Sequence, residues 1–158
     1  MMWKRIGILL AVVLLAACSD ASEKPEPTLG ADVKMAEAYL EEQGYEVVSY
    51  KGNRTSSFEK SDLLELPTRS TWEVQTTPPD EYIGRNIRQE HFIVRNHPLG
   101  QANVFVMMVD GEIIGGTSFP DSAEPLVGSS YSLDGKTSEE LHPDYWTWRE
   151  QWETKYSE

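Results

Sequence analysis

Residues 104–119, VFVMMVDGEIIGGTSF, decide the fold of this chain. Residues 104–109 are apolar at both odd and even positions, which is typical of a central strand covered on both faces. The Asp-Gly pair at 110–111 is a good signal for a two-residue hairpin turn, and residues 112–119 supply the returning strand. The glycine pair at 115–116 predicts a bulge or a close backbone contact. This stretch therefore predicts an antiparallel hairpin at the centre of a sheet.

Further strands are predicted on both sides of this hairpin. Residues 45–50, 71–75 and 87–95 alternate in polarity or end in β-branched and aromatic side chains, as half-buried strands do. Residues 131–133 predict a short edge segment. The polar residues 51–57 predict a loop. Together these patterns indicate a mainly antiparallel sheet of four or five strands.

A helix is predicted before the first strand, over residues 31–43. Val33, Ala36 and Leu40 recur at helical spacing and fall on one face, which we expect to pack on the sheet. Gly44 follows directly and is a common C-terminal stop for a helix.

A second helix is predicted at the C-terminus, over residues 142–156. Its aromatic stripe consists of four residues, Tyr145, Trp148, Trp152 and Tyr156. At 3.6 residues per turn these side chains lie within about 80° of one another. We expect the stripe to close the core against the sheet, with a partner-binding face as the alternative, since Trp and Tyr dominate binding hot spots. Trp146 falls off the stripe, so we expect it to be exposed and treat it as a candidate binding residue. The chain is thus predicted to be α+β, with helices at both ends of the domain.

The N-terminus has the pattern of a targeting segment. Lys4 and Arg5 form a short positive region, and residues 6–17 are uncharged and almost entirely apolar. This run is shorter than the roughly 20 residues that a helix needs to cross a bilayer. Its length and flanks favour a cleaved signal peptide over a permanent membrane span.

The signal ends in Leu15-Ala16-Ala17-Cys18, which resembles the lipobox of bacterial lipoproteins at all four positions. That resemblance implies that residues 1–17 are removed and that the thiol of Cys18 carries a lipid anchor on the outer face of the cell membrane. Residues 18–30 would then be the lipidated cysteine and a disordered, proline-containing tether, and residues 31–158 a single extracytoplasmic domain. The alternative is a buried free cysteine at the end of an apolar helix, which leaves the charged and apolar regions before it unexplained.

Several stretches of the domain also resemble small lipoproteins of Gram-positive bacteria. They are LLELP (63–67), TWEVQ (71–75), FIVRNHPL (92–99), VDGEIIGGTSFP (109–120) and YSLDGKTSEEL (131–141). This resemblance agrees with a lipid anchor and implies no particular activity.

Charge limits the classes of partner. Removal of Lys4 and Arg5 leaves 12 basic residues against 26 acidic residues, a net charge near −14. Nucleic-acid binding needs a basic surface, and an acidic domain is repelled by anionic lipid headgroups. We therefore expect membrane contact only through the lipid anchor, a partner or ligand in the cell envelope, no nucleic acid, and a monomeric domain.

The sequence contains no motif of a known catalytic or metal site. It lacks G-x-S-x-G, H-E-x-x-H, C-x-x-C and a phosphate-binding glycine loop, and its three histidines, His91, His97 and His142, lack metal-ligand spacing. We expect no cofactor and no metal, and surface or turn positions for the histidines. His97 is a candidate binding residue because its segment lies at a predicted strand end.

Three function classes remain, with a non-enzymatic binding or accessory module favoured. The alternative is a small cell-envelope hydrolase that uses two carboxylates, for which facing acids of shifted pKa in a deep pocket would be the sign. A solute-binding lipoprotein of a transporter is disfavoured, because about 140 residues suit one domain rather than two lobes.

The lipobox resemblance generates the first prediction. Cys18→Ala removes the only thiol in the chain, so the variant should take up no radiolabelled fatty acid and should not be cut before residue 18. The unchanged chain should partition into detergent. Appearance of the unchanged chain in the medium, unlipidated and cut at another site, would contradict the anchor.

Overall fold

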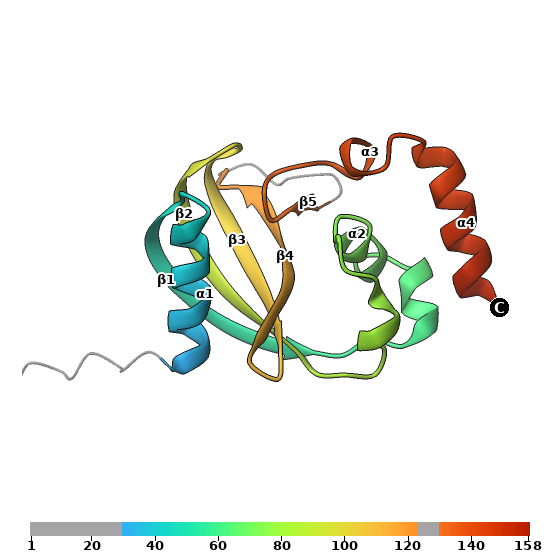
Figure 1. Ribbon diagram of the computed structural model, residues 1–158, viewed down its shortest axis with the longest axis horizontal. Helices are drawn as coiled ribbons and strands as arrows, with labels where there is room; N and C mark the ends of the chain where they lie inside the picture. Colours follow the sequence, from blue (N-terminus) through green and yellow to red (C-terminus); the bar gives the residue numbers. More distant parts are fainter. Residues whose placement is uncertain (1–29, 123–129) are drawn as a thin grey trace, which may run out of the picture.

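A five-stranded antiparallel sheet forms one part of the molecule (Figure 1). The structure is a computed structural model and describes residues 30–122 and 130–158, so the predicted signal peptide, Cys18 and residues 19–29 of the tether lie outside the described residues. The strands follow one another in the order β1-β2-β3-β4-β5. Their bounds are Glu46–Ser56 (β1), Ile87–His97 (β2), Gly100–Val109 (β3), Glu112–Pro120 (β4) and Tyr131–Ser132 (β5). With helices at both ends, this confirms the predicted α+β class and sheet.

The β3–β4 hairpin has the predicted two-residue turn. Val109 pairs with Glu112, and the residues between them, Asp110 and Gly111, have φ angles of 51° and 81°. Two consecutive positive φ angles define the turn whose twist matches that of the flanking strands, and Asp-Gly is a favoured sequence for it.

β4 also contains the irregularity predicted at its glycine pair. Met107 pairs with Gly115 and Met108 pairs with Ile113, so Ile114 has no partner on β3. An extra residue of this kind bends the strand and increases its twist. The bulge changes the direction of β4 immediately before its paired segment against β5.

α1, Ala31–Glu42, covers one face of the sheet (Figure 1). Its buried residues are Val33, Ala36 and Leu40, as the sequence predicts. Gly44, two residues after the helix, has a φ of 87°, and the Tyr45 N–H donates to the Leu40 carbonyl at 3.1 Å. This backbone arrangement requires the left-handed conformation that glycine adopts at low cost. The sheet residues in the same core are Phe92, Val94, Ala102, Val104, Val106 and Met108.

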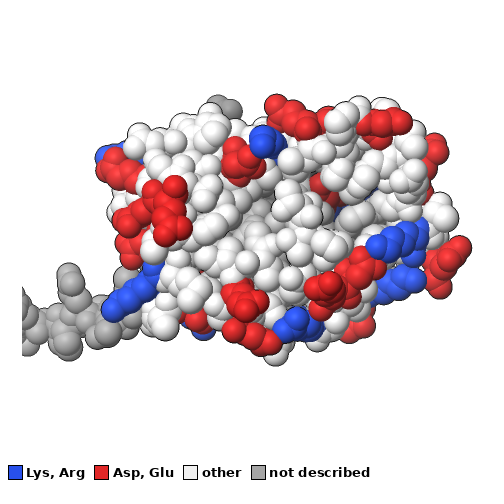
Figure 2. All heavy atoms as spheres, in the orientation of Figure 1, with Lys and Arg blue, Asp and Glu red and all other residues white. Residues whose placement is uncertain are grey.

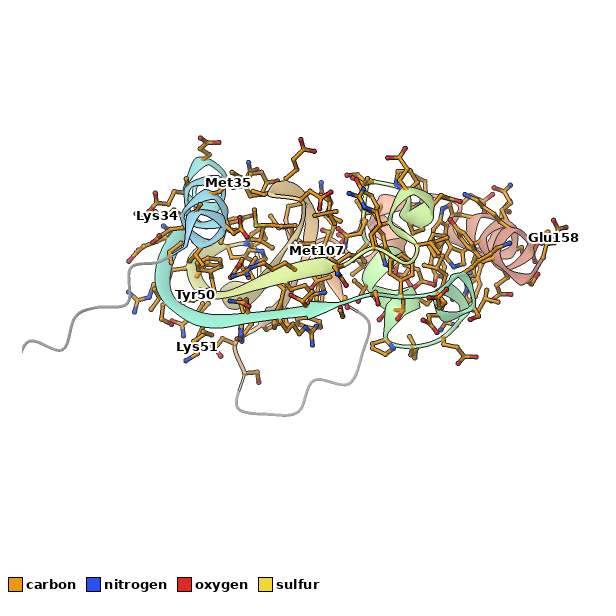
Figure 3. The ribbon with its side chains drawn as sticks, turned by 90° about the horizontal axis from the view of Figure 1, so that it is seen from below. Lys34, Met35, Tyr50, Lys51, Met107 and Glu158 are labelled. Carbon is orange, nitrogen blue, oxygen red and sulfur yellow. The ribbon has the colours of Figure 1, made fainter. Side chains whose placement is uncertain are left out.

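A helical part lies beyond one end of the sheet (Figure 1). Its elements are η1 (Lys60–Leu64), α2 (Thr68–Trp72), η2 (Pro79–Tyr82), α3 (Ser138–Leu141) and α4 (Tyr145–Ser157). A second core forms here from Phe58, Leu63, Trp72, Ile87, Met107, Val109, Trp152 and Tyr156. Met107 comes from β3 and lies where that strand meets the helical part (Figure 3). β3 therefore contributes to both cores, which confirms that it is covered on both faces.

The side chain of Gln75 attaches the helical part to β4. Its Nε2 donates to the Gly116 carbonyl at 2.9 Å, and its Oε1 accepts from the Gly116 N–H at 2.9 Å. This pair of hydrogen bonds imitates the pairing of a neighbouring strand. A Cβ at Gly115 would lie 2.2 Å from the Gln75 Oε1, and one at Gly116 would lie 2.4 Å from the Phe105 carbonyl oxygen. The predicted close backbone contact is present, and the missing side chains make it possible.

The expectation of a strand over residues 71–75 is wrong. Thr68–Trp72 form the helix α2, and Trp72, Glu73 and Val74 are all buried. Alternation over five residues cannot separate a strand from a helical turn that is surrounded on all sides. The side-chain amide of Gln75, rather than a strand backbone, supplies the pairing to the sheet.

Two element bounds also differ from expectation. β1 continues through residues 51–56, predicted as a loop, and these residues pair with β2. They are polar because β1 is an edge strand with a largely exposed end. The last helix starts at Tyr145 rather than at residue 142, and α3 precedes it. A capping box of Thr137 and Glu140 starts α3.

The surface is dominated by acidic side chains. On the face that carries α1, Figure 2 shows more acidic than basic side chains, most of them toward the edge of the view, with uncharged residues between them. No helix in residues 30–122 and 130–158 has the length and hydropathy needed to span a membrane.

The aromatic stripe packs on the helical part rather than on the sheet surface. Trp152 is 8% exposed and donates its indole N–H to the Leu63 carbonyl at 2.8 Å, and Tyr156 is also buried. Tyr145 and Trp148 are half-buried. The stripe thus closes a core, as expected, but its partners are η1 and α2 rather than the predicted sheet surface.

Trp152→Ala should lower the free energy of unfolding by about 3–5 kcal/mol, because it removes a buried aromatic side chain and its hydrogen bond. Trp146→Ala, at a position 76% exposed, should change it by less than about 0.5 kcal/mol. Urea unfolding of both variants, made on the chain from Ser19 onward, measures the difference. Equal stability of the two variants would instead support a binding face.

Candidate functional site

An aromatic cleft lies between α4 and residues 72–79. Its volume is about 310 Å³, at the lower end of the range for small-molecule sites. Five of the residues that line it are aromatic: Trp72, His142, Trp148, Trp152 and Tyr156. We call this feature the aromatic cleft.

The aromatic rings of α4 form a continuous series along the cleft. Trp148 and Trp152 have ring centroids 5.1 Å apart, and Trp152 and Tyr156 meet edge to face at 4.7 Å. The imidazole of His142 stacks on Trp148 at 3.8 Å with an interplanar angle of 11°. Trp72 and Trp152 are buried, so Trp148 is the more accessible tryptophan of the cleft.

A buried carboxylate holds one end of the cleft together. Glu73 is 2% exposed, and its Oε1 lies 3.1 Å from Arg149 Nη1 of α4 and 3.4 Å from Arg69 Nε of α2. The Glu73 carbonyl also accepts a hydrogen bond from His142 Nε2 at 2.8 Å. One residue therefore joins α2, α4 and the segment before α4.

Burial raises the pKa of the Glu73 carboxyl above its ordinary value, and the positive charges of Arg149 and Arg69 offset only part of that rise. Desolvation penalises the charged form of a carboxyl, whereas nearby cations favour it. The direction of the shift shows that burial is the larger of the two effects.

A second ion pair holds the other end of the cleft. Lys155 Nζ donates to Asp80 Oδ2 at 2.7 Å, and Tyr156 Oη donates to the same oxygen at 3.0 Å. The hydrogen bond from Lys155 lowers the pKa of Asp80. Asp80 and Lys155 are about half exposed, so the pair adds little stability but fixes the position of η2 against α4.

The rim of the cleft carries polar groups that are not used within the described protein. Thr76 and Gln151 are exposed and Thr77 is half-buried, and none of their side chains has a hydrogen bond within residues 30–122 and 130–158. The one charged side chain in the lining is Lys155, which Asp80 neutralises. The cleft thus combines aromatic walls with free amide and hydroxyl groups.

The sequence predicted a surface or turn position for His97, but the structure buries this side chain. It is 5% exposed at the end of β2, and its ring packs beside Tyr45. Its Nδ1 accepts from the Leu99 N–H at 3.1 Å, and its Nε2 bonds the Leu133 carbonyl at 3.0 Å. Both ring nitrogens are taken by the protein, so the ring joins the β2–β3 turn to the segment after β5.

Trp146 is exposed, as expected, and contacts Tyr145 edge to face at 5.3 Å. It does not line the aromatic cleft. The structure also does not bring Trp146 and His97 together, because Trp146 lies on α4 of the helical part and His97 lies at the end of β2, beside Tyr45.

A second buried carboxylate, Glu90, lies apart from the cleft under α1. It accepts a hydrogen bond from Tyr50 Oη at 2.7 Å and another from Arg88, which also lies 3.6 Å from Asp32 of α1. This network joins α1 to β1 and β2. Neither Glu90 nor Glu73 lines the aromatic cleft.

The histidines occupy separate environments. His91 forms a hydrogen bond with Asn103 Oδ1 at 2.8 Å and stacks on Phe105. The partners of His142 are different residues, Glu73 and Trp148. In the part of the chain that the structure describes, no group of three or more His, Cys, Asp or Glu residues is arranged to hold a metal ion.

By fold, the protein is an α+β domain with an antiparallel meander sheet, one covering helix and a helical part that carries an aromatic cleft. Comparisons with models of protein families, with curated proteins and with solved structures gave no match.

Sequence reasoning missed the importance of Glu73, Gln75 and His142. Nothing in the pattern of residues 71–75 distinguishes a buried, paired glutamate from an exposed one on a strand. The stripe on α4 did indicate the aromatic wall: its members Trp152 and Tyr156 are buried core residues that also line the cleft, and Trp148 is the half-buried member of the lining.

Glu73→Gln tests the effect of burial on the carboxyl. Because the folded-state pKa is raised, the folded protein binds this proton more tightly than the unfolded chain does. Binding of this proton therefore adds to the free energy of unfolding. The contribution is fully present below the pKa of the carboxyl in the unfolded chain, and it is lost as the pH rises through the pKa in the folded protein. Relative to the variant, the unchanged protein should therefore gain stability as the pH falls from 7 to about 4.5. Urea unfolding at several pH values measures this trend; the opposite slope would mean that the arginines outweigh burial.

Proposed function

We propose that the protein is a membrane-anchored extracytoplasmic lipoprotein that acts as a non-enzymatic binding module, with the aromatic cleft as its binding site. The observation that carries the proposal is the cleft itself, whose two walls are joined at both ends by Glu73–Arg149 and Asp80–Lys155. A site held in this way needs little ordering when a ligand binds. The anchor rests on the lipobox resemblance at Cys18.

The position of the cleft supports this arrangement. The N-terminus of α1, to which the tether would connect, and α4 lie at opposite ends of the molecule (Figure 1). A tether of residues 19–29 extends to at most about 36 Å. A domain held in this way can present the cleft away from the membrane, toward the cell envelope or the medium.

The second candidate, a carboxylate-based hydrolase, finds less support. Such an enzyme needs two carboxylates that reach its substrate. Among the described residues, no aspartate or glutamate lines the aromatic cleft. Of the two most buried carboxylates, Glu73 lies between arginines and Glu90 accepts from Arg88 and Tyr50.

A photo-reactive amino acid placed at position 151 tests the proposal in intact cells. Irradiation should attach an envelope component to the cleft, seen by mass spectrometry of the purified protein. The adduct should be lost with Trp148→Ala and kept with Trp146→Ala, since Trp148 lines the cleft and Trp146 does not.

The matched control places the same photo-reactive group at position 41, exposed on α1. The same adduct from both positions, or an adduct from position 151 that survives Trp148→Ala, would show that the cleft is not the binding site.

A further inference from the structure

We infer that the ligand of the aromatic cleft is a neutral saccharide. This inference rests on the proposed function and names the chemical class of the ligand. It follows from the charge, the hydrogen-bonding groups and the shape of the cleft lining.

The charge of the lining selects a neutral ligand. Lys155 is the one charged side chain that lines the cleft, and its ammonium group donates to Asp80 Oδ2 at 2.7 Å. An anion would find a cation that is already paired. A cation would find aromatic faces but also the ammonium group of Lys155, which lies 4.9 Å from the ring centroid of Tyr156. A ligand without charge avoids both conflicts.

The aromatic wall suits the apolar face of a sugar ring. Aromatic faces are electron-rich and attract the weakly positive C–H groups that a pyranose presents on one side. Trp148 is half-buried, and His142 stacks on one of its faces. Its indole N–H has no hydrogen bond within the described residues, so it is a free donor beside the rings.

The rim suits the hydroxyl groups of a sugar. The amide of Gln151 and the hydroxyls of Thr76 and Thr77 each donate and accept, and all three are unused within the described chain. The loop side of the cleft contains Pro78 and Pro79, which have no N–H to offer. The loop therefore offers fewer backbone donors than a strand edge does, which favours a ligand rich in hydroxyls over an extended peptide that pairs through its backbone.

Isothermal titration calorimetry on the full chain tests the inference. The probes are the tetrasaccharides of β-1,4-linked N-acetylglucosamine, β-1,4-linked glucose and α-1,4-linked glucose. The chain is kept in solution with a polyoxyethylene detergent. Glycoside detergents are avoided because they carry sugars that could compete for the cleft. At least one tetrasaccharide should bind, and Trp148→Ala should raise its Kd about tenfold or more.

Two further variants separate binding from folding. Gln151→Ala alters an exposed side chain, and it should raise the Kd about threefold at an unchanged melting temperature. Trp146→Ala, exposed but outside the cleft, should leave the Kd unchanged. Saccharide binding that is insensitive to both Trp148→Ala and Gln151→Ala would overturn the inference.

A proline decapeptide and tetramethylammonium serve as competing probes. If no tetrasaccharide binds and either of these binds in a Trp148-dependent manner, the saccharide inference is wrong and the proposed binding cleft stands. If no probe binds, the saccharide inference is wrong, and if cross-linking from position 151 also yields nothing, the proposed binding cleft is wrong as well.

Discussion

The side-chain amide of Gln75 on the backbone of Gly116 is the contact on which the arrangement of sheet and helices depends. It is possible because β4 has no side chain at Gly115, where a Cβ would lie 2.2 Å from the Gln75 Oε1. The same amide donates to the Thr71 carbonyl at 2.7 Å, so the loop after α2 is fixed to α2 and to the sheet together. Residues 76–79 then continue from a fixed point and form the loop wall of the aromatic cleft.

Glu73 gives the cleft its second fixed point at a free-energy cost. Its raised pKa shows that burial of the carboxylate is not fully offset by Arg69 and Arg149. Replacement of a buried ion pair by apolar residues is often neutral or stabilising, so stability alone does not account for such a group. What Glu73 does provide is a fixed position for α4. Its carboxylate forms ion pairs with two arginines, and its carbonyl accepts a hydrogen bond from His142. In the aromatic cleft, that position sets the distance between the two walls.

The sequence predicted the parts of the structure that depend on local patterns. The β3–β4 hairpin follows from residues 104–119, and α1 follows from three apolar residues at helical spacing. The polar end of β1 and the helix α2 were missed, because an edge strand needs no apolar face and a five-residue pattern fits either structure. The aromatic cleft could not be predicted from the sequence for a different reason. His142 and Glu73 are 69 residues apart, and only the folded chain brings them into contact.

At the proposed binding site, the acidic surface and the neutral cleft would act together on the choice of ligand. Acidic side chains outnumber basic ones in the chain and on the face shown in Figure 2, and their field extends over about 8 Å at physiological ionic strength. Anionic polymers and lipid headgroups are therefore repelled before they reach the cleft. An uncharged ligand experiences no such repulsion, and its affinity depends on the rings and the rim alone. The many carboxylates, which contribute no group to the cleft lining, would thus act against anionic competitors of the proposed neutral ligand.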